Sequence, residues 1–268
     1  PVSIALAFAT ESVTNTLAFT NINGVLLFCM AFFLWAFIEA ERTPQLAWVS
    51  GIAIGLAILI KPQFAPLLFL PLVKLQWRNL LAGLGIPVVL NLLAWPLVPG
   101  ASGYLDKLVP YLSTTRDYAN SSWAGLRAYV EFGPVLYWVV WVIFAALIGC
   151  AVLGLLRWRQ SEPVFWALTT SGAIMVGIFF LSSLGQQYYS MWLFPLIFTV
   201  VLPRSVFHSV GAWVAAFLFL APVSWTSHAH PDAGRWMNFF SGTVGWSLLI
   251  VITFACVAGW WRATQIKD

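Results

Sequence analysis

Charge is what this sequence lacks most. Asp, Glu, Lys and Arg make up 8% of the 268 residues, whereas apolar residues make up 61%, and the mean hydropathy is +0.87. A water-soluble domain of this length needs a charged surface, so the composition excludes that class. The 13 Lys and Arg residues lie mostly in short loops and form no basic stripe, which argues against a nucleic-acid partner.

Paired cysteines and cofactor motifs are also missing. Cys29, Cys150 and Cys256 each lie inside an apolar run, without metal or redox spacing, and are interpreted as small core hydrophobes. The segment from His228 to Asp232 carries metal-ligand residue types but has no third partner at a fixed spacing. No Walker loop, nucleotide-binding glycine pattern or catalytic triad order is present. We therefore expect no cofactor and no metal site, although use of a divalent metal stays open.

Long apolar runs are what the sequence has instead. They cover residues 25–38, 46–60, 64–73, 80–98, 134–156, 164–184, 188–202, 210–223 and 244–261. This pattern predicts an all-α, polytopic helical membrane protein with about nine membrane segments in one transmembrane domain over residues 1–268. Residues 1–10 are too few to cross a hydrocarbon core, which takes about 20 residues. We expect them to be the tail of a helix from a longer, N-terminally truncated chain.

The runs 46–60 and 64–73 are separated only by Lys61-Pro62-Gln63, which is compatible with one kinked helix or with a short hairpin. The hairpin gathers most basic loops on one side, and the kinked helix scatters them, so the positive-inside rule favours the hairpin. The gathered cations are Arg42, Lys74, Arg78, Arg157, Arg159, Arg204, Arg262 and Lys267. Residues 11–24, 61–63, 100–133, 185–189 and 224–241 then face outward. This orientation predicts a multi-pass plasma-membrane protein whose polar groups gather on the extracytoplasmic side.

Lys61 is the sharpest local feature. A helix over 46–60 rises only about 22 Å, short of a hydrocarbon core of about 30 Å, so the hairpin apex is expected below the outer surface. Pro62 disfavours helical geometry at the residue before it and ends the helix there. Lys61 either snorkels to the lipid headgroups or holds an anionic group such as a phosphate.

Other polar groups cluster on the same outer side. Asn21 and Asn23 open a span, where they could cap a helix or bind sugar hydroxyls. Gln187 and Tyr188 stand at an outer mouth, and they fit either an aromatic belt or carbohydrate contact. These residue types all donate and accept hydrogen bonds, as sugar recognition requires.

The sequence of the outer loop 100–133 predicts two consecutive segments. Its first piece predicts an interfacial amphipathic helix, whose apolar face would carry Tyr104, Leu105, Leu108, Val109 and Leu112. A polar run over 114–122 follows, and it holds Arg116 and Asp117. Arg116 suits a bidentate phosphate contact, and Asp117 could orient it or bind a sugar hydroxyl; a solvated loop with a local ion pair is the alternative.

Cations, amides, tyrosines and carboxylates at one lipid edge indicate chemistry on a polar group carried by a lipid. A polyprenyl-phosphate sugar would place its phosphate near the cations and its hydroxyls near the amides. Transfer needs a carboxylate base for the acceptor hydroxyl, and a single displacement inverts the anomeric centre. A lipid-sugar flippase or transporter is the alternative from another class, but transporters tend to carry midplane charge and internal repeats, which this sequence does not clearly show.

Residues 16–23, Thr-Leu-Ala-Phe-Thr-Asn-Ile-Asn, resemble the Thr-Leu-x-x-Gly-Gln-x-Asn block of bacterial polyprenyl-phosphate-dependent glycosyltransferases of the C superfamily. Glu11 matches an acidic position of that family. Residues 51–63 are similar to its Gly-rich helix ending in Lys-Pro. Thr20 and Asn21 depart from the usual Gly-Gln, although they suit a subgroup of the family.

That subgroup is the arabinofuranosyltransferases that add α(1→3) branches to cell-wall arabinan in mycolate-containing actinobacteria. Residues 18–24, 86–99, 110–122, 187–194 and 200–204 resemble it. The resemblance implies decaprenylphosphoryl-β-D-arabinofuranose as the lipid-linked donor and arabinan, a polysaccharide or glycolipid-borne glycan, as the acceptor. A mannosyltransferase of the same family, using polyprenyl-phosphate mannose, is the alternative.

In this superfamily the catalytic Asp follows the first helix, a region that would precede Pro1, so no residue here is assigned as the general base. Candidate substrate-binding residues are Glu11, Asn21, Asn23, Lys61, Gln63, Tyr111, Arg116, Asp117, Asn120, Gln187 and Tyr188.

Overall fold

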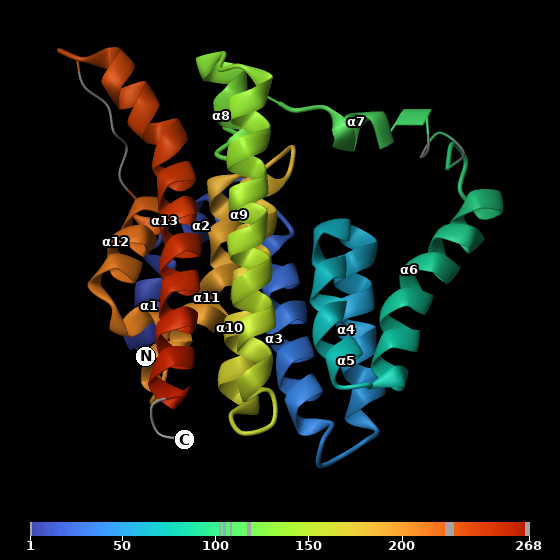
Figure 1. Cartoon of the computed structure of the whole chain (residues 1–268). Helices are drawn as coiled ribbons and strands as arrows, with labels where there is room; N and C mark the ends of the chain where they lie inside the picture. The colour runs from blue at the N-terminus through green and yellow to red at the C-terminus, as the bar shows by residue number, and fades with distance from the viewer. Residues whose placement is uncertain are drawn as a thin grey trace. The chain divides into compact units, whose positions relative to one another are not determined.

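A computed structural model describes residues 2–101, 103, 106–107, 109–116, 119–222 and 228–265. Within these ranges the chain forms helices joined by turns and no strand, so the predicted all-α class is confirmed (Figure 1). The chain divides into two compact units, each described by itself. The first unit comprises Pro1–Asn23 and Thr115–Asp268, and the second unit comprises Gly24–Thr114.

The first unit holds two short N-terminal helices and the C-terminal helices. Its α-helices are α1 (Val2–Phe8), α2 (Glu11–Ala18), α8 (Trp123–Val130), α9 (Pro134–Leu155), α10 (Pro163–Leu181), α11 (Phe194–Phe198), α12 (Val210–Leu220) and α13 (Pro231–Gln265). Its 3₁₀ segments are η3 (Leu156–Trp158), η4 (Gln187–Leu193), η5 (Thr199–Val201) and η6 (Val206–His208).

Local sequence explains several helix starts in this unit. Proline, whose fixed φ suits the first helical position, begins α9 and α10. The hydroxyl of Ser209 accepts a hydrogen bond from the N–H of Ala212 at 3.2 Å and caps α12. Helices α9, α10 and α13 then pack on one another, and α12 packs on α13 (Figure 1). A Cβ at Gly245 would lie 2.8 Å from the carbonyl of Ala215, so glycine lets α12 and α13 approach closely.

Aromatic side chains fill the core of the first unit. Trp166, Trp192, Trp246 and Phe179 are fully buried. The indole of Trp246 donates to the hydroxyl of Ser190 at 3.0 Å, so this ring is buried with its polar atom satisfied. Phe179 packs against Trp192 and Trp246, with ring centroids 5.9 and 5.4 Å away. This cluster joins α10, η4 and α13 and holds η4 rigidly in place.

The second unit contains α3 (Asn23–Glu39), α4 (Leu46–Ile60), η1 (Pro62–Leu68), α5 (Phe69–Val73), α6 (Trp77–Leu97) and α7 (Val109–Ser113). Helix α4 ends at Lys61, which is extended (φ −137°, ψ 105°) ahead of Pro62, as predicted. The chain then reverses, because Lys74, after α5, forms an ion pair with Glu41, before α4. The predicted hairpin is therefore confirmed in the path of the chain.

A buried polar chain ties α3, α4 and α6 together. The amide of Asn79 donates to the hydroxyl of Ser50 at 2.7 Å, and Ser50 donates to the carbonyl of Phe33 at 3.0 Å. A Cβ at the neighbouring Gly51 would lie 2.5 Å from the carbonyl of Asn79, so only glycine allows this contact. Small residues and interhelical hydrogen bonds are the usual means of packing helices in lipid.

Four helical stretches in the described part of the chain are long and apolar enough to cross a membrane: Trp77–Leu97, Pro134–Trp158, Pro163–Leu181 and Phe240–Thr264. Four shorter apolar helical stretches accompany them: Asn23–Glu39, Leu46–Ile60, Pro62–Val73 and Val210–Leu220. Large apolar side chains on α9, including Val135 at 76% and Trp138 at 57%, are exposed. Such a surface suits contact with lipid rather than water. The chain is thus of membrane-protein type; the figure of about nine segments stays a prediction.

The interfacial helix predicted in loop 100–133 is described only in part. Helix α7 includes Val109, which is half exposed. Tyr104, Leu105 and Leu108, three residues of the predicted apolar face, lie outside the described residues. The amphipathic character of this segment therefore stays a prediction.

Candidate functional site

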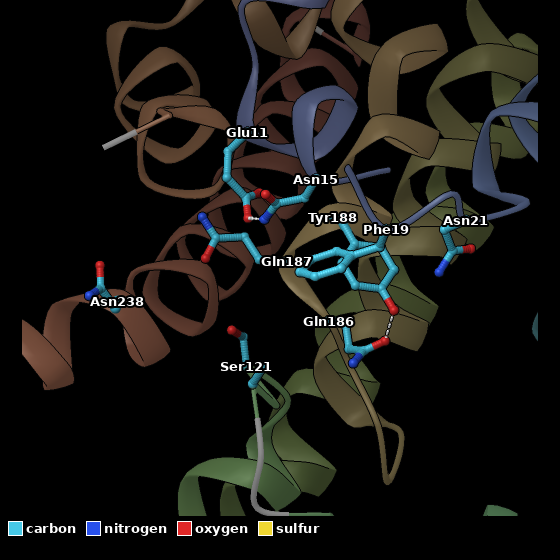
Figure 2. Close-up of a pocket in the computed structure, with 10 residues that line it drawn as sticks. Glu11, Asn15, Phe19, Asn21, Ser121, Gln186, Gln187, Tyr188 and Asn238 are labelled. Carbon is cyan, nitrogen blue, oxygen red and sulfur yellow. Dashed lines mark hydrogen bonds between the residues drawn. The ribbon is translucent and has the colours of Figure 1, made fainter. Parts of the chain in front are cut away.

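A pocket of about 380 Å³ opens in the first unit between α2, η4, α13 and the loop before α8 (Figure 2). This volume lies within the range of small-molecule sites, roughly 300–1,000 Å³. Its lining is mainly polar side chains with two aromatic rings, of which Phe19 is exposed and Tyr188 is half-buried. The lining residues are Glu11, Asn15, Phe19, Asn21, Ala119, Ser121, Gln186, Gln187, Tyr188 and Asn238.

Helix α2 places a carboxyl group at the pocket, the one carboxyl among its described lining residues. Glu11 opens α2, and Asn15, one turn later, donates a hydrogen bond to Glu11 Oε1. Glu11 Oε2 is buried and has no hydrogen-bond partner in the described part of the chain. Burial raises the pKa of Glu11 from 4.5 to about 7, against the opposing effect of the Asn15 hydrogen bond. Glu11 is therefore an acid poised near neutrality at the wall of a polar pocket.

Two further features of α2 position pocket residues: its contact with η4 and the turn that ends it. The hydroxyl of Thr16 contacts Met191 Sδ at 3.4 Å, which holds α2 on η4. Thr20 then adopts a left-handed conformation (φ 49°), and the N–H of Asn21 returns to the carbonyl of Thr16 at 2.9 Å. This tight turn brings Phe19 and Asn21 to the pocket (Figure 2).

Asn120 fastens the opposite wall. Its Oδ1 accepts from the N–H groups of Gly185 at 2.9 Å and Ser122 at 3.1 Å. Its Nδ2 donates to the carbonyls of Ser183 at 2.9 Å and Arg116 at 2.7 Å. The side chain is fully buried and every hydrogen-bonding position of its amide is used. Asn120 therefore holds the loop before α8 against the turn before η4.

Ser121 completes this wall. Its N–H donates to the carbonyl of Gly185 at 2.7 Å, and its carbonyl accepts from the hydroxyl of Thr243 on α13 at 2.6 Å. The loop, the turn before η4 and α13 are thereby locked together around the pocket. On the η4 side the phenol of Tyr188 donates to Gln186 Oε1, which orients both side chains (Figure 2).

The predicted site residues fall into distinct groups. Glu11, Asn21, Gln187 and Tyr188 line the pocket as one cluster. Three others of the first unit lie elsewhere. Asn23 is buried, and its carbonyl accepts from the indole of Trp192 at 3.2 Å. Asn120 is buried, and its amide forms hydrogen bonds with backbone groups. Arg116 is half-buried, and its positive charge acts on the Tyr188 phenol, although it does not line the pocket.

The remaining predictions concern other parts of the chain. Lys61 and Gln63 are half-buried at the apex of the hairpin in the second unit, and Tyr111 is half exposed on α7. Asp117 lies outside the described residues. A substrate-binding role for these four residues stays a prediction.

Several pocket residues were not predicted. Asn15 lies four residues after Glu11, a spacing that puts both on one helix face, so helical periodicity could have identified it. Ser121 and Gln186 lie inside polar runs, where residue type alone does not distinguish them from their neighbours. Asn238 carries no sequence signal, because it is brought to the pocket only by the packing of α13.

A second pocket, of about 330 Å³, lies between the start of α10 and the segment after η5. Its charged groups are already paired, since Arg204 forms an ion pair with Glu162. The guanidinium of Arg204 also lies 4.9, 5.6 and 5.9 Å from the rings of Trp158, Phe165 and Trp260. This arrangement stabilises a helix junction and offers little free bonding capacity to a ligand.

Metal-ligand residue types do not converge in the described part of the chain. No group of three or more His, Cys, Asp or Glu side chains there could hold a metal ion. Use of a metal by the protein stays an open prediction.

Comparison with known proteins identifies relatives of the whole chain. Residues 1–183 match the sequence model of glycosyltransferase family 87. The chain is 56% identical over 262 residues to an alpha-(1->3)-arabinofuranosyltransferase of Corynebacterium glutamicum, covering 97% of this chain and 61% of that protein. Proteins of the same name from Mycolicibacterium smegmatis and Mycobacterium tuberculosis are 42% and 40% identical, covering 96% and 95% of this chain and 59% and 58% of theirs.

The chain thus spans about 60% of the length of these curated relatives. No solved structure matches it.

Proposed function

Because the chain belongs to glycosyltransferase family 87, we propose that it forms part of a membrane glycosyltransferase that adds α(1→3) arabinofuranosyl branches to arabinan. The name shared by the relatives, at up to 56% identity, supports this choice of sugar and linkage. The donor in this proposal is decaprenylphosphoryl-arabinofuranose, as the sequence resemblance implies.

The polar pocket is the observation that carries the proposal. Amide and hydroxyl groups that both donate and accept hydrogen bonds suit sugar hydroxyls, and two aromatic rings suit the apolar faces of a sugar. The carboxyl of Glu11 supplies an acceptor that is only partly satisfied within the described residues. These features fit a site that binds carbohydrate.

The proposed reaction is a single displacement. The acceptor hydroxyl oxygen attacks the anomeric carbon of the donor, the bond from that carbon to the phosphate oxygen breaks, and the phosphate leaves on its lipid. The proton of the attacking hydroxyl passes to a carboxylate base, and the anomeric configuration inverts. The family resemblance assigns this base to no residue of the sequence, and we assign Arg116 to stabilising the phosphate charge.

The apolar helices and the loop charges support a proposed membrane setting. We propose that the shorter apolar helices enter the bilayer beside the four long ones, giving about nine membrane segments. Because Arg and Lys concentrate in the loops of one side, that side is cytoplasmic and the pocket of the first unit opens on the extracytoplasmic side. The lipid donor would then approach laterally through the bilayer.

A donor assay tests the proposal. Membranes containing the full-length protein that includes this chain are given radiolabelled arabinofuranosyl or mannosyl polyprenyl phosphate, together with a linear arabinan oligosaccharide. We expect arabinose transfer, with new α(1→3) branch points in linkage analysis. Incorporation of mannose alone would refute the arabinose assignment, and movement of labelled donor across the membrane without any transfer would indicate a flippase.

A further inference from the structure

We propose that the pocket of the first unit binds the neutral glycan acceptor, and that the phosphate of the lipid donor binds outside it. This inference rests on the proposed function. It assigns the acceptor and the donor phosphate of the proposed reaction to two separate binding sites. It also assigns Glu11, Asn15 and Asn238 to acceptor recognition, with Glu11 contacting a sugar hydroxyl.

The charge of the pocket wall is the first argument. Among the described residues that line the pocket there is no Lys, Arg or His, and Glu11 is the one carboxyl group. Phosphate sites in proteins use Arg, Lys or several free backbone N–H groups. Ionised Glu11 would repel a phosphate, whereas its carboxyl can form a hydrogen bond with a neutral hydroxyl in either protonation state. The wall therefore selects against the charged end of the donor.

The hydrogen-bonding groups of the wall are the second argument. Asn15 comes from α2, Ser121 from the loop before α8, Gln187 from η4 and Asn238 from α13. Figure 2 shows these side chains arranged around one space. Each side chain offers both a donor and an acceptor, which matches the dual character of a sugar hydroxyl. Convergence from four separate elements is typical of a binding site rather than of a helix cap.

The two aromatic rings are the third argument. Phe19 is 68% exposed although it is a large apolar side chain, and Tyr188 lies beside the same pocket. The face of an aromatic ring is electron-rich and attracts the weakly positive C–H groups of a sugar ring. The rings therefore offer a surface for stacking a sugar whose hydroxyls reach the surrounding amides.

Glu11 is the centre of this arrangement. Asn15 occupies Oε1 with one hydrogen bond, and Oε2 has no partner among the described residues. A buried carboxyl with unused acceptor capacity costs free energy unless a ligand supplies a donor. A hydroxyl of the bound glycan supplies such a donor. Arg116 is not among the described lining residues, yet its positive charge favours the ionised form of the Tyr188 phenol, and we assign the donor phosphate to this cation.

Kinetics of the full-length protein separate the two substrates. Glu11→Gln replaces one acceptor oxygen by a donor, and Asn238→Ala removes an amide from the exposed side of α13. We expect each variant to raise the acceptor KM about tenfold, the effect of losing one hydrogen bond of roughly 1.4 kcal/mol. The donor KM stays unchanged. Asn91→Ala, an exposed Asn of α6, is the matched control and leaves both KM values unchanged.

Direct binding makes the test independent of transfer. Saturation-transfer NMR on the purified full-length protein measures an α-arabinofuranosyl oligosaccharide that carries no lipid and no phosphate, with decaprenyl monophosphate as the competitor. We expect the oligosaccharide to bind, to bind more weakly to both variants, and to persist when decaprenyl monophosphate is added.

Several results would overturn the assignment. They are a raised donor KM with an unchanged acceptor KM, no change in either KM, or displacement of the oligosaccharide by decaprenyl monophosphate. Failure of the proposed function is distinguishable, because a protein that binds the oligosaccharide through Glu11 and Asn238 but transfers no arabinose retains the subsite and loses the assigned reaction.

Discussion

Replacing Asn120 by Asp should weaken the attachment of the loop before α8 to the turn before η4. The substitution leaves the side-chain volume almost unchanged. The wild-type Nδ2 donates to the carbonyls of Ser183 and Arg116, and Oδ1 accepts from Gly185 and Ser122. Asp retains both acceptor positions but has no N–H. A carboxylate oxygen would therefore face two carbonyl oxygens in a fully buried position.

The size of the effect follows from this count. Each lost hydrogen bond costs about 1 kcal/mol net, and leaving a buried carbonyl without a partner raises the cost to about 1–3 kcal/mol for each group. Two such groups give a loss of about 3 kcal/mol in the free energy of unfolding. For a chain of this size each kcal/mol lowers Tm by about 2–4 °C, so we expect a drop of about 6–12 °C.

Thermal unfolding in detergent, followed by intrinsic tryptophan fluorescence, measures this drop. Hydrogen exchange adds a local readout, because the N–H of Ser121 bonds to the carbonyl of Gly185 and should exchange faster in the variant. Asn238→Asp is the matched control, since Asn238 is exposed on α13 and precedes the apolar stretch Phe240–Thr264. A Tm shift no larger than that of the control, with unchanged protection of the Ser121 amide, would refute the proposed role of Asn120.

Other perturbations follow from the same structure. Because burial raises the pKa of Glu11 from 4.5 to about 7, the folded state holds a proton that the unfolded state has released between these pH values. Stability should therefore fall by about 2–3 kcal/mol as pH rises through this window, and Glu11→Gln should abolish that fall in Tm measured against pH. Gly185→Ala puts a Cβ 2.2 Å from a carbonyl oxygen of α10 and should cost about 1–3 kcal/mol in denaturant unfolding. Lys61→Ala should raise the donor KM by removing a recessed cation, whereas the exposed Lys107→Ala should not; equal values would return Lys61 to a snorkelling role. Arg116→Ala should also raise the donor KM and leave the acceptor KM unchanged, and the reverse pattern would contradict its placement beside the phosphate.

Much of the candidate site was predictable from sequence because polar residues stand out in an apolar chain. Polarity predicts Glu11, Asn21, Gln187 and Tyr188 as site residues, and all four line one pocket. The same ground selects Asn120, whose amide makes four hydrogen bonds to backbone groups in the structure. Residue type alone does not reveal whether hydrogen-bonding capacity is spent inside the fold or left for a ligand.

Composition and residue order determined the all-helical class and the hairpin at Lys61. These are local properties. Hydropathy, proline geometry and loop charge depend on residue types within one short segment of the chain. Tertiary packing alone decided that Asn238 reaches the same pocket as Glu11, and that Asn120 joins a loop to a turn about 60 residues away. These two placements depend on how α13 and η4 pack around buried tryptophans. Contacts between segments distant in the sequence produce no hydrophobic periodicity from which they could be predicted.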